Sequence, residues 1–60
     1  MTRMLTLDDV ASFLAVSRRT VERLIAGGEL PRPVKIGASS RMPEDDVQRY
    51  IERQLRKRGG

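Results

Sequence analysis

The short distance between two helical patterns constrains the fold of this chain more than any other feature of its sequence. The first pattern runs from Leu7 to about Ala15, and the second opens at Ser17. Ala15 and Val16 are left to make the turn, and Val16 is expected to pack between the two helices. Helices joined by so few residues are typical of a helix-turn-helix. The spacing therefore predicts that arrangement.

The first helix has a start signal and a one-sided apolar pattern. Thr6 can cap it, and Asp8 and Asp9 stand in its first turn, where the helix dipole favours negative charge. Apolar residues recur at helical spacing on one stripe, which indicates a helix that faces a core. This stripe consists of Leu7, Val10, Ala11 and Leu14, with Phe13 at its border.

The second helix, from residue 18 to about 26, is the main candidate for a binding element. Ser17 is expected to cap it, and the glycines at 27 and 28 to end it, because one glycine can adopt the left-handed backbone needed there. Arg19 and Arg23 stand opposite the apolar stripe and project outward. A helix with outward hydrogen-bond donors fits the major groove of DNA. The stripe itself consists of Val21, Leu24 and Ile25.

The segment after the second helix predicts a small β-hairpin. Prolines at 31 and 33 forbid a helical restart, and residues 34–36 alternate apolar, basic and apolar, as a short strand does. Residues 37–40 are expected to form a tight turn, with Arg41 and Met42 as the return strand. Because an isolated hairpin is marginal in water, Val34, Ile36 and Met42 should point inward against the helices.

A third helix is predicted from Glu44 onward. Acidic residues at 44–46 occupy its first turn, and Pro43 stands at or just before its start. Its expected buried stripe is Val47, Tyr50, Ile51 and Leu55. The predicted fold class is therefore mainly α with a small β-hairpin, a winged helix-turn-helix of three helices and a two-stranded wing.

The charges of the third helix are expected to be mainly structural. The spacings Asp45 to Arg49 and Glu52 to Arg56 predict ion pairs four residues apart on an exposed face. The basic residues 56–58 suit the dipole at the end of the helix, with a phosphate contact as an open alternative. The glycines at 59 and 60 are expected to be disordered.

Composition excludes several classes of function. A chain of 60 residues predicts one domain over 1–60, with an ordered core of about 4–57. It contains no Cys and no His, which removes thiol nucleophiles and the usual metal ligands. We therefore expect no enzymatic activity, no metal and no cofactor.

No long apolar stretch follows the first residues, so neither a signal peptide nor a membrane span is expected, and the cytoplasm is the expected location.

The charge balance favours a polyanionic partner. Twelve Lys and Arg against eight Asp and Glu give a net charge of +4 and an isoelectric point near 10.7. Acids concentrate at residues 8–9 and 44–46, whereas cations predominate between them. Nucleic acid is the leading partner, with anionic lipid behind it. One Tyr and one Phe cannot form an aromatic stacking sheet, which makes RNA the weaker choice.

Four spaced segments of the chain match a known pattern. They are Leu5-Thr6-Leu7-Asp8-Asp9-Val10-Ala11, Leu14-Ala15-Val16-Ser17-Arg18-Arg19-Thr20-Val21, Leu24-Ile25-Ala26-Gly27-Gly28-Glu29-Leu30-Pro31, and Asp46-Val47 followed by Tyr50-Ile51. Together, over roughly residues 5 to 53, they resemble the excisionase family of small winged-helix DNA-binding proteins. That family is related to AlpA-type regulators and to the DNA-binding domain of MerR proteins.

The resemblance implies a mode of action. The helix at 18–26 would enter the major groove, and the wing around 37–41 would touch the DNA backbone or the minor groove. Such proteins bind as several copies on neighbouring sites and bend DNA, so that a phage integrase performs excision rather than integration. The chain departs from the family pattern at Glu22 and Met42, where relatives often carry an aromatic residue.

The candidate contacts differ in their expected roles. Arg19 and Arg23 are expected to read bases, because the planar fork of arginine makes bidentate contacts with guanine or phosphate. Arg18, in the first turn near the core border, suits phosphate positioning. Glu22 either pairs with Arg18 or accepts from cytosine, and Thr20 either touches DNA or supports the first turn of the helix.

Wing residues are expected to bind less specifically. Lys35 and Arg41 suit phosphate or minor-groove contacts, and Ser39 and Ser40 are turn formers first. The full set of expected DNA contacts is Ser17, Arg18, Arg19, Thr20, Glu22, Arg23, Lys35, Ser39, Ser40 and Arg41.

Three functions remain open from the sequence. The first is an excisionase that binds double-stranded DNA beside neighbouring copies and a phage integrase, in the cytoplasm of a bacterial host. The second is a phage or prophage transcription regulator of the AlpA type. The third, from another class, is a small protein-interaction module such as an antitoxin, whose cations meet an acidic partner.

Overall fold

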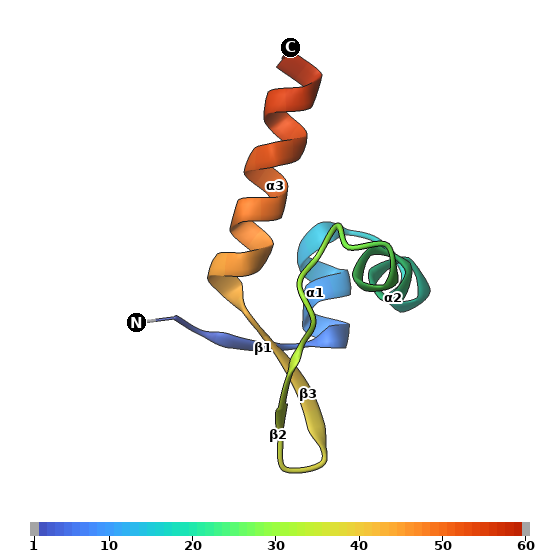
Figure 1. Cartoon of the computed structure of the whole chain (residues 1–60), viewed down its shortest axis with the longest axis vertical. Coiled ribbons are helices and arrows are strands. Elements are labelled where there is room, and N and C mark those ends of the chain that lie inside the picture. Colours follow the sequence, from blue (N-terminus) through green and yellow to red (C-terminus); the bar gives the residue numbers. More distant parts are fainter. Residues whose placement is uncertain (1, 60) are drawn as a thin grey trace.

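The computed structural model describes residues 2–59, which form three helices and one three-stranded antiparallel sheet (Figure 1). In chain order the elements are β1 (Met4–Thr6), α1 (Leu7–Leu14), α2 (Arg18–Ala26), β2 (Val34–Ile36), β3 (Ser39–Pro43) and α3 (Glu44–Gly59). Helix α1 packs on α2, the hairpin of β2 and β3 projects from one end, and α3 extends from the other (Figure 1). The predicted winged helix-turn-helix is confirmed.

Strand β1 is an addition that the sequence pattern did not predict. It pairs with β3 in a sheet of order β1-β3-β2, and its Leu5 lies opposite Met42. Leu5 is 3% exposed and Met42 is fully buried, so this cross-strand pair lies in the core. The wing, formed by β2 and β3, is therefore attached to the hydrophobic core through β3, the central strand of the sheet.

Helix α1 begins with a capping box. The backbone N–H of Asp9 donates to Thr6 Oγ1 at 2.9 Å, and the backbone N–H of Thr6 donates to Asp9 Oδ2 at 3.2 Å. The helix ends at Leu14, and the cap residue Ala15 that follows it has a left-handed φ of 59°. Thr6 thus caps the helix as predicted, and the reciprocal bond, which the Asp9 carboxylate accepts from the Thr6 N–H, satisfies a second backbone donor.

Helix α2 has the boundaries that its sequence predicted. Ser17 Oγ accepts a hydrogen bond from the backbone N–H of Thr20 at 3.2 Å. Beyond the last turn, Gly28 has a φ of 82°, the left-handed conformation that glycine adopts without strain. The Ser17 cap therefore sets the start of α2, and the left-handed Gly28 follows its end.

The hydrophobic core collects apolar residues from all parts of the fold except β2. Leu30, which follows α2, is 1% exposed and was not among the predicted core residues. Tyr50 and Ile51 of α3 are half-buried against this core, as Leu14, Leu24 and Ile25 are. The core residues are Leu5, Leu7, Val10, Ala11, Val21, Leu30, Met42 and Val47.

Four apolar residues expected inside are exposed. Val16 in the turn is 37% exposed, and Leu55 of α3 is 49% exposed because the helix has passed the core by that point. Val34 and Ile36 of the wing are 48% and 53% exposed. The register explains the last two: Val34 pairs with Arg41, whose neighbour Met42 turns into the core, so alternation sends Val34 and Ile36 to the opposite face.

Helix α3 begins at Glu44, directly after Pro43, as predicted. Its ion pairing differs from the prediction, because Arg49 Nη2 lies 2.5 Å from Asp46 Oδ1, three residues away, while Asp45 accepts a hydrogen bond from Thr2. Helix α3 extends to Gly59, and Gly60, also expected to be disordered, lies outside the described residues. Within residues 2–59 no helix has the length and apolarity needed to cross a bilayer.

Candidate nucleic-acid interface

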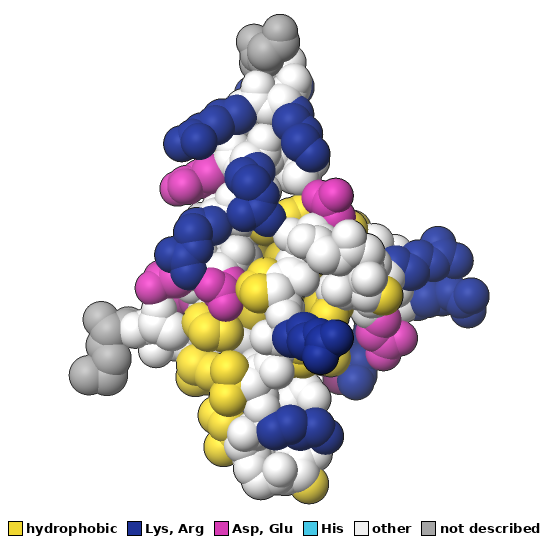
Figure 2. Space-filling model, in the orientation of Figure 1, with side chains coloured by type: hydrophobic (Ala, Val, Ile, Leu, Met, Phe, Trp, Pro, Cys, Tyr) yellow, Lys and Arg dark blue, Asp and Glu magenta, His cyan; other side chains and the backbone are white. Residues whose placement is uncertain are grey.

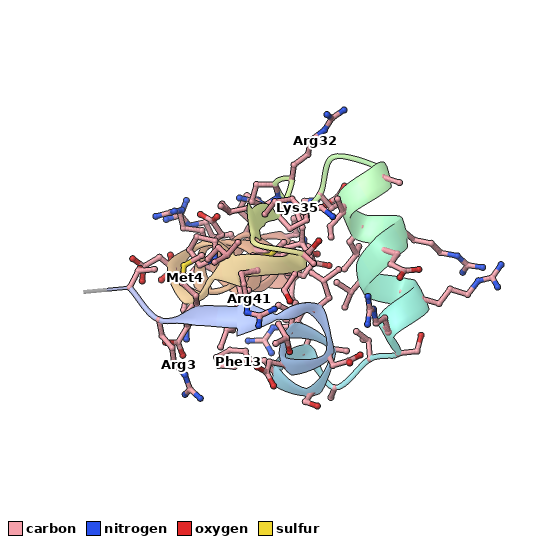
Figure 3. All side chains as sticks on the ribbon, turned by 90° about the horizontal axis from the view of Figure 1, so that it is seen from below. Arg3, Met4, Phe13, Arg32, Lys35 and Arg41 are labelled. Carbon is pink, nitrogen blue, oxygen red and sulfur yellow. The ribbon has the colours of Figure 1, made fainter. Side chains whose placement is uncertain are left out.

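The outer face of α2 presents arginines clear of the rest of the molecule. Arg19 and Arg23 are exposed, whereas Val21, on the opposite face of the same helix, is fully buried. Figures 2 and 3 show basic side chains over α2 that point away from the body of the protein. A helix that packs against the core with one face and exposes basic side chains on the opposite face has the form of a helix that binds in the major groove.

Arg18 sits at the junction of the two helices. Its guanidinium lies 3.4 Å from Asp8 Oδ1 of α1 and 3.4 Å from Glu22 Oε2 of α2. The predicted pairing with Glu22 is therefore present, and Asp8 is a second partner that the sequence did not indicate. All three side chains are more than half exposed, so these pairs contribute little to stability, and phosphates can compete for the guanidinium.

Ser17 and Thr20 are engaged in the start of α2. Their hydroxyl oxygens lie 3.0 Å apart, in addition to the capping bond from the Thr20 backbone. Thr20 is half-buried, and Ser17 is exposed. Of the two roles considered for Thr20, support of the first turn is the one visible in these contacts.

A groove of about 310 Å³ separates the start of the helix-turn-helix from the wing. Four of the predicted contacts converge on it, although one of them is more than twenty residues from the other three in sequence. Those four are Arg18, Ser39, Ser40 and Arg41, and the other lining residues are Thr6, Leu7, Asp8 and Ala38. The fold thus places Arg18 of α2 and Arg41 of the wing along the same groove.

The serines of the wing lie on a strand rather than in the turn. The turn consists of Gly37 and Ala38 alone, with Gly37 at a φ of 63°, and Ser39 already pairs with Ile36 in the ladder. A two-residue loop with glycine at its first position suits the twist of a hairpin. The assignment of Ser39 and Ser40 as turn formers is therefore wrong, and both side chains are half-buried beside the groove.

Lys35 and Arg41 lie on opposite faces of the hairpin. Lys35 pairs with Ser40, which alternation places on the same side of the sheet as the core residue Met42. Arg41, half-buried, donates a hydrogen bond from Nη1 to the Ser40 carbonyl at 3.2 Å. Figure 3 shows both side chains near the hairpin, with Arg32 extending further outward. Residues 30–43 carry these three cations and no acid.

One carboxylate near the groove has a shifted pKa. The hydrogen bond from the Thr6 backbone N–H, followed by one from the Thr6 side chain, lowers the pKa of Asp9 below its ordinary value of 3.8. The charges of Arg3 and Arg41 act in the same direction. Asp9 therefore stays ionised at neutral pH and holds the cap of α1.

The described part of the chain offers no metal site. Across residues 2–59, no group of three or more Asp, Glu, His or Cys side chains is placed to hold an ion.

Comparisons with known proteins agree with this geometry. The helix-turn-helix domain family matches residues 4–55. Two relatives from Mycobacterium tuberculosis are each 41% identical over 51 residues: "Putative DNA-binding protein MT0521" of strain CDC 1551 / Oshkosh and "Putative DNA-binding protein Rv0500A" of strain ATCC 25618 / H37Rv. The matched region covers 85% of this chain but 64% of each relative. No solved structure matches the chain.

Proposed function

Because this chain belongs to the helix-turn-helix domain family, we propose that it is a DNA-binding protein that reads sequence through α2 in the major groove. In this proposal it is a binding protein and not an enzyme, and it acts on double-stranded DNA in the bacterial cytoplasm. The DNA-binding names of the two mycobacterial relatives support the choice of partner.

One observation carries the proposal. Arg19 and Arg23 are exposed on a helix whose opposite face is anchored by the fully buried Val21, and whose start is capped by Ser17. Fixed placement matters because a bidentate arginine contact discriminates between bases only when its geometry is held. We assign base reading to these two arginines.

The groove beside α2 suits the sugar-phosphate backbone. Arg18 and Arg41 bring cations to it, and Ser39 and Ser40 also line it. Lys35 adds a further cation on the side of the wing that faces the helices. In this arrangement the wing positions the duplex or enters its minor groove, and α2 selects the sequence.

For the biological task we propose a phage excisionase, or recombination directionality factor. A single small module buries only about 600–1,000 Å² on DNA, which limits the specificity of one copy. We therefore expect several copies on neighbouring repeats, DNA bending, and cooperation with an integrase. The resemblance of residues 5–53 to excisionases supports this role, and a promoter-bound regulator of the related AlpA type is the second candidate.

Selection of bound fragments from the host or phage genome tests both levels of the proposal. Recovery of repeated sites at recombination arms beside an integrase gene is the expected result. Recovery of promoters instead would favour the AlpA-type regulator. A salt series on the selected duplex completes the test, because affinity that does not fall steeply with salt contradicts DNA binding and favours an acidic protein partner.

A further inference from the structure

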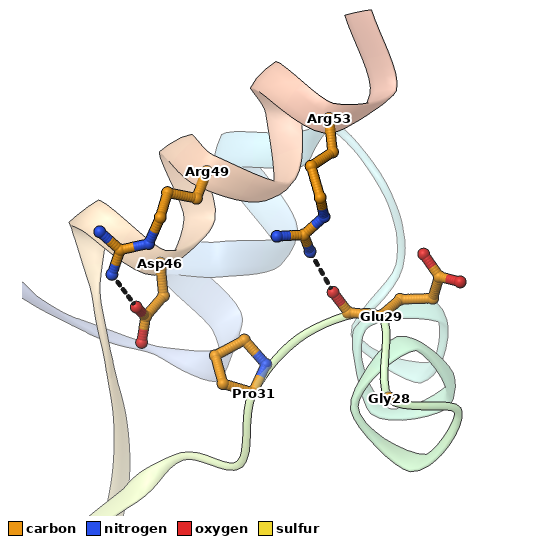
Figure 4. A pocket seen from close by; sticks show the side chains of 6 residues that line it. All are labelled: Gly28, Glu29, Pro31, Asp46, Arg49 and Arg53. Atoms are coloured by element: carbon orange, nitrogen blue, oxygen red, sulfur yellow. Dashed lines mark hydrogen bonds and ion pairs between the residues drawn. The ribbon is translucent and has the colours of Figure 1, made fainter. Parts of the chain in front are cut away.

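A hollow of about 430 Å³ lies between α3 and the loop that follows α2, and none of the predicted DNA contacts lines it (Figure 4). Arg49 and Arg53 reach into it from successive turns of α3, and the facing wall comes from the loop. The lining residues are Gly28, Glu29, Pro31, Asp46, Arg49 and Arg53. The two arginines face the same hollow but have different partners.

Arg53 connects two distant parts of the chain. Its Nη2 donates a hydrogen bond to the backbone carbonyl of Glu29 at 2.7 Å, across 24 residues of sequence (Figure 4). Its guanidinium also lies over the ring of the half-buried Tyr50, 6.0 Å from the ring centroid. Arg49, in contrast, pairs with Asp46 inside its own helix.

The carbonyl that Arg53 binds belongs to the segment that terminates α2. The backbone N–H groups of Glu29 and Leu30 both donate to the Leu24 carbonyl, at 2.8 and 3.1 Å. Leu30 then enters the core, with 1% of its surface exposed. The segment that ends α2 is therefore held by the burial of Leu30 in the core and by the hydrogen bond from Arg53.

Arg53 follows Ile51, where the packing of α3 against the core ends. Val47 is fully buried and Ile51 half-buried, but Leu55 is 49% exposed, so the core stops supporting α3 near its middle. Arg53 lies beyond that point and still contacts the loop. Its planar donor group is oriented by Tyr50, which reduces the conformational freedom lost when the hydrogen bond forms.

We propose that Arg53 is a positioning residue for the DNA-reading helix, acting through the Glu29 carbonyl without touching DNA. This inference rests on the proposed function of α2 as the reading element. Arg53 fixes the angle at which α2 leaves the body, so that Arg19 and Arg23 reach the base edges together. Its loss should reduce discrimination between sequences more than it reduces attraction to phosphates.

The test compares Arg53→Ala with Arg53→Lys and with the matched control Arg49→Ala. Arg49→Ala removes the same charge from the same hollow but leaves the Glu29 carbonyl bonded. Amide hydrogen exchange reports on the anchor itself. We expect exchange at Glu29 and Leu30 to rise about tenfold in Arg53→Ala, to rise less in Arg53→Lys, and to stay unchanged in Arg49→Ala.

DNA binding is measured on the duplex selected from genomic fragments and on a scrambled duplex, at a temperature where every variant is folded. In Arg53→Ala the preference for the selected duplex should fall about three- to tenfold, with an unchanged salt slope and partial rescue by lysine.

A salt slope reduced by about one would mean that Arg53 contacts phosphate, and would overturn the proposal. Unchanged exchange at Glu29 and Leu30 would also overturn it. If the parent protein fails to prefer the selected duplex, the proposed function itself is wrong, whereas the exchange data still decide whether Arg53 holds the loop.

Discussion

Helix α2 and the wing carry the predicted DNA contacts on supports of very different strength. Helix α2 is capped by Ser17, closed by Gly28, and anchored through Val21 to the core. Strand β2, in contrast, is exposed along its whole length, and its described strand partner is β3. Arg19 and Arg23 thus stand on a helix anchored to the core, whereas Lys35 stands on an exposed strand that is held through β3.

This difference separates two tasks that one small domain has to perform. Reading bases requires donors at fixed positions, whereas attraction to phosphates depends on charge and tolerates movement. The anchored helix therefore suits specificity, and the exposed strand β2 of the wing suits general affinity. If the two tasks are divided in this way, variants of α2 and of the wing should differ in their effects on stability and on DNA binding.

The largest effect should come from the root of the wing. Met42→Ala removes a fully buried side chain that pairs across the sheet with Leu5, and should lower the free energy of unfolding by about 2–5 kcal/mol. Ile36→Ala, at the exposed end of the wing, is the matched control and should change it by less than about 0.5 kcal/mol. Urea denaturation measures both. Equal losses would mean that the outer wing is as tightly packed as its root.

The next effect concerns the arginines of α2. Arg19→Ala or Arg23→Ala should cost about 1–3 kcal/mol of binding free energy and relax base preference at one position of the site. Binding to a panel of single-base variants of the selected duplex measures this. Parental affinity and preference in both variants would refute the assignment of base reading to α2.

A smaller effect is expected at the start of α2. Ser17→Ala removes the acceptor of the Thr20 N–H and should cost about 1 kcal/mol of stability, equivalent to a fall in Tm of about 4–8 °C. Ser39→Ala, on strand β3 of the wing, provides the comparison and should leave Tm nearly unchanged. Thermal unfolding followed by circular dichroism distinguishes them. A larger fall in Tm for Ser39→Ala than for Ser17→Ala would mean that the wing contributes more to stability than the start of α2.

The wing cation should act on all sequences alike. Lys35→Ala should weaken binding to the selected and scrambled duplexes by the same factor and lower the salt slope by about one. The measurement is affinity across a salt series on both duplexes. A change in preference without a change in slope would show that the wing reads bases.

The smallest effect is the acid sensitivity of the cap of α1. Hydrogen bonds from Thr6 hold the pKa of Asp9 below 3.8 in the folded chain, so the unfolded chain takes up its proton first as pH falls. The stabilisation is therefore present above that ordinary value and is lost as pH falls through the lower folded value. Tm recorded from about pH 5 to pH 2 should fall less steeply in Asp9→Asn than in the parent, with Asp8→Asn as the control. Identical slopes for Asp9→Asn and the parent would exclude this role for Asp9.

The helices were predictable because their signals are local. Thr6 and Ser17 as caps, Gly28 as a left-handed end, and Pro43 before Glu44 all act within a few residues of the boundary they set. The apolar spacing of α1 likewise identified its buried residues. For the same reason the exposed positions of Arg19 and Arg23 followed from helical periodicity alone.

The sheet was predicted less well because pairing depends on distant residues. Strand β1 is three residues long, too short for alternation to reveal it, and it forms through pairing with residues 41–43. That pairing fixes Met42 toward the core and so sends Val34 and Ile36 outward, against the prediction. The burial of Leu30 likewise depends on where the chain returns after α2.

The amino-acid sequence by itself determined the three helices, their start signals and the outward arginines of α2, because helix formation and capping are decided by neighbours along the chain. Tertiary structure alone decided which face of the wing meets the core, that Arg18 and Arg41 share a groove, and that Arg53 reaches the Glu29 carbonyl. These features join residues far apart in sequence, and their geometry is set only when strand pairing and core packing fix the separate elements against one another.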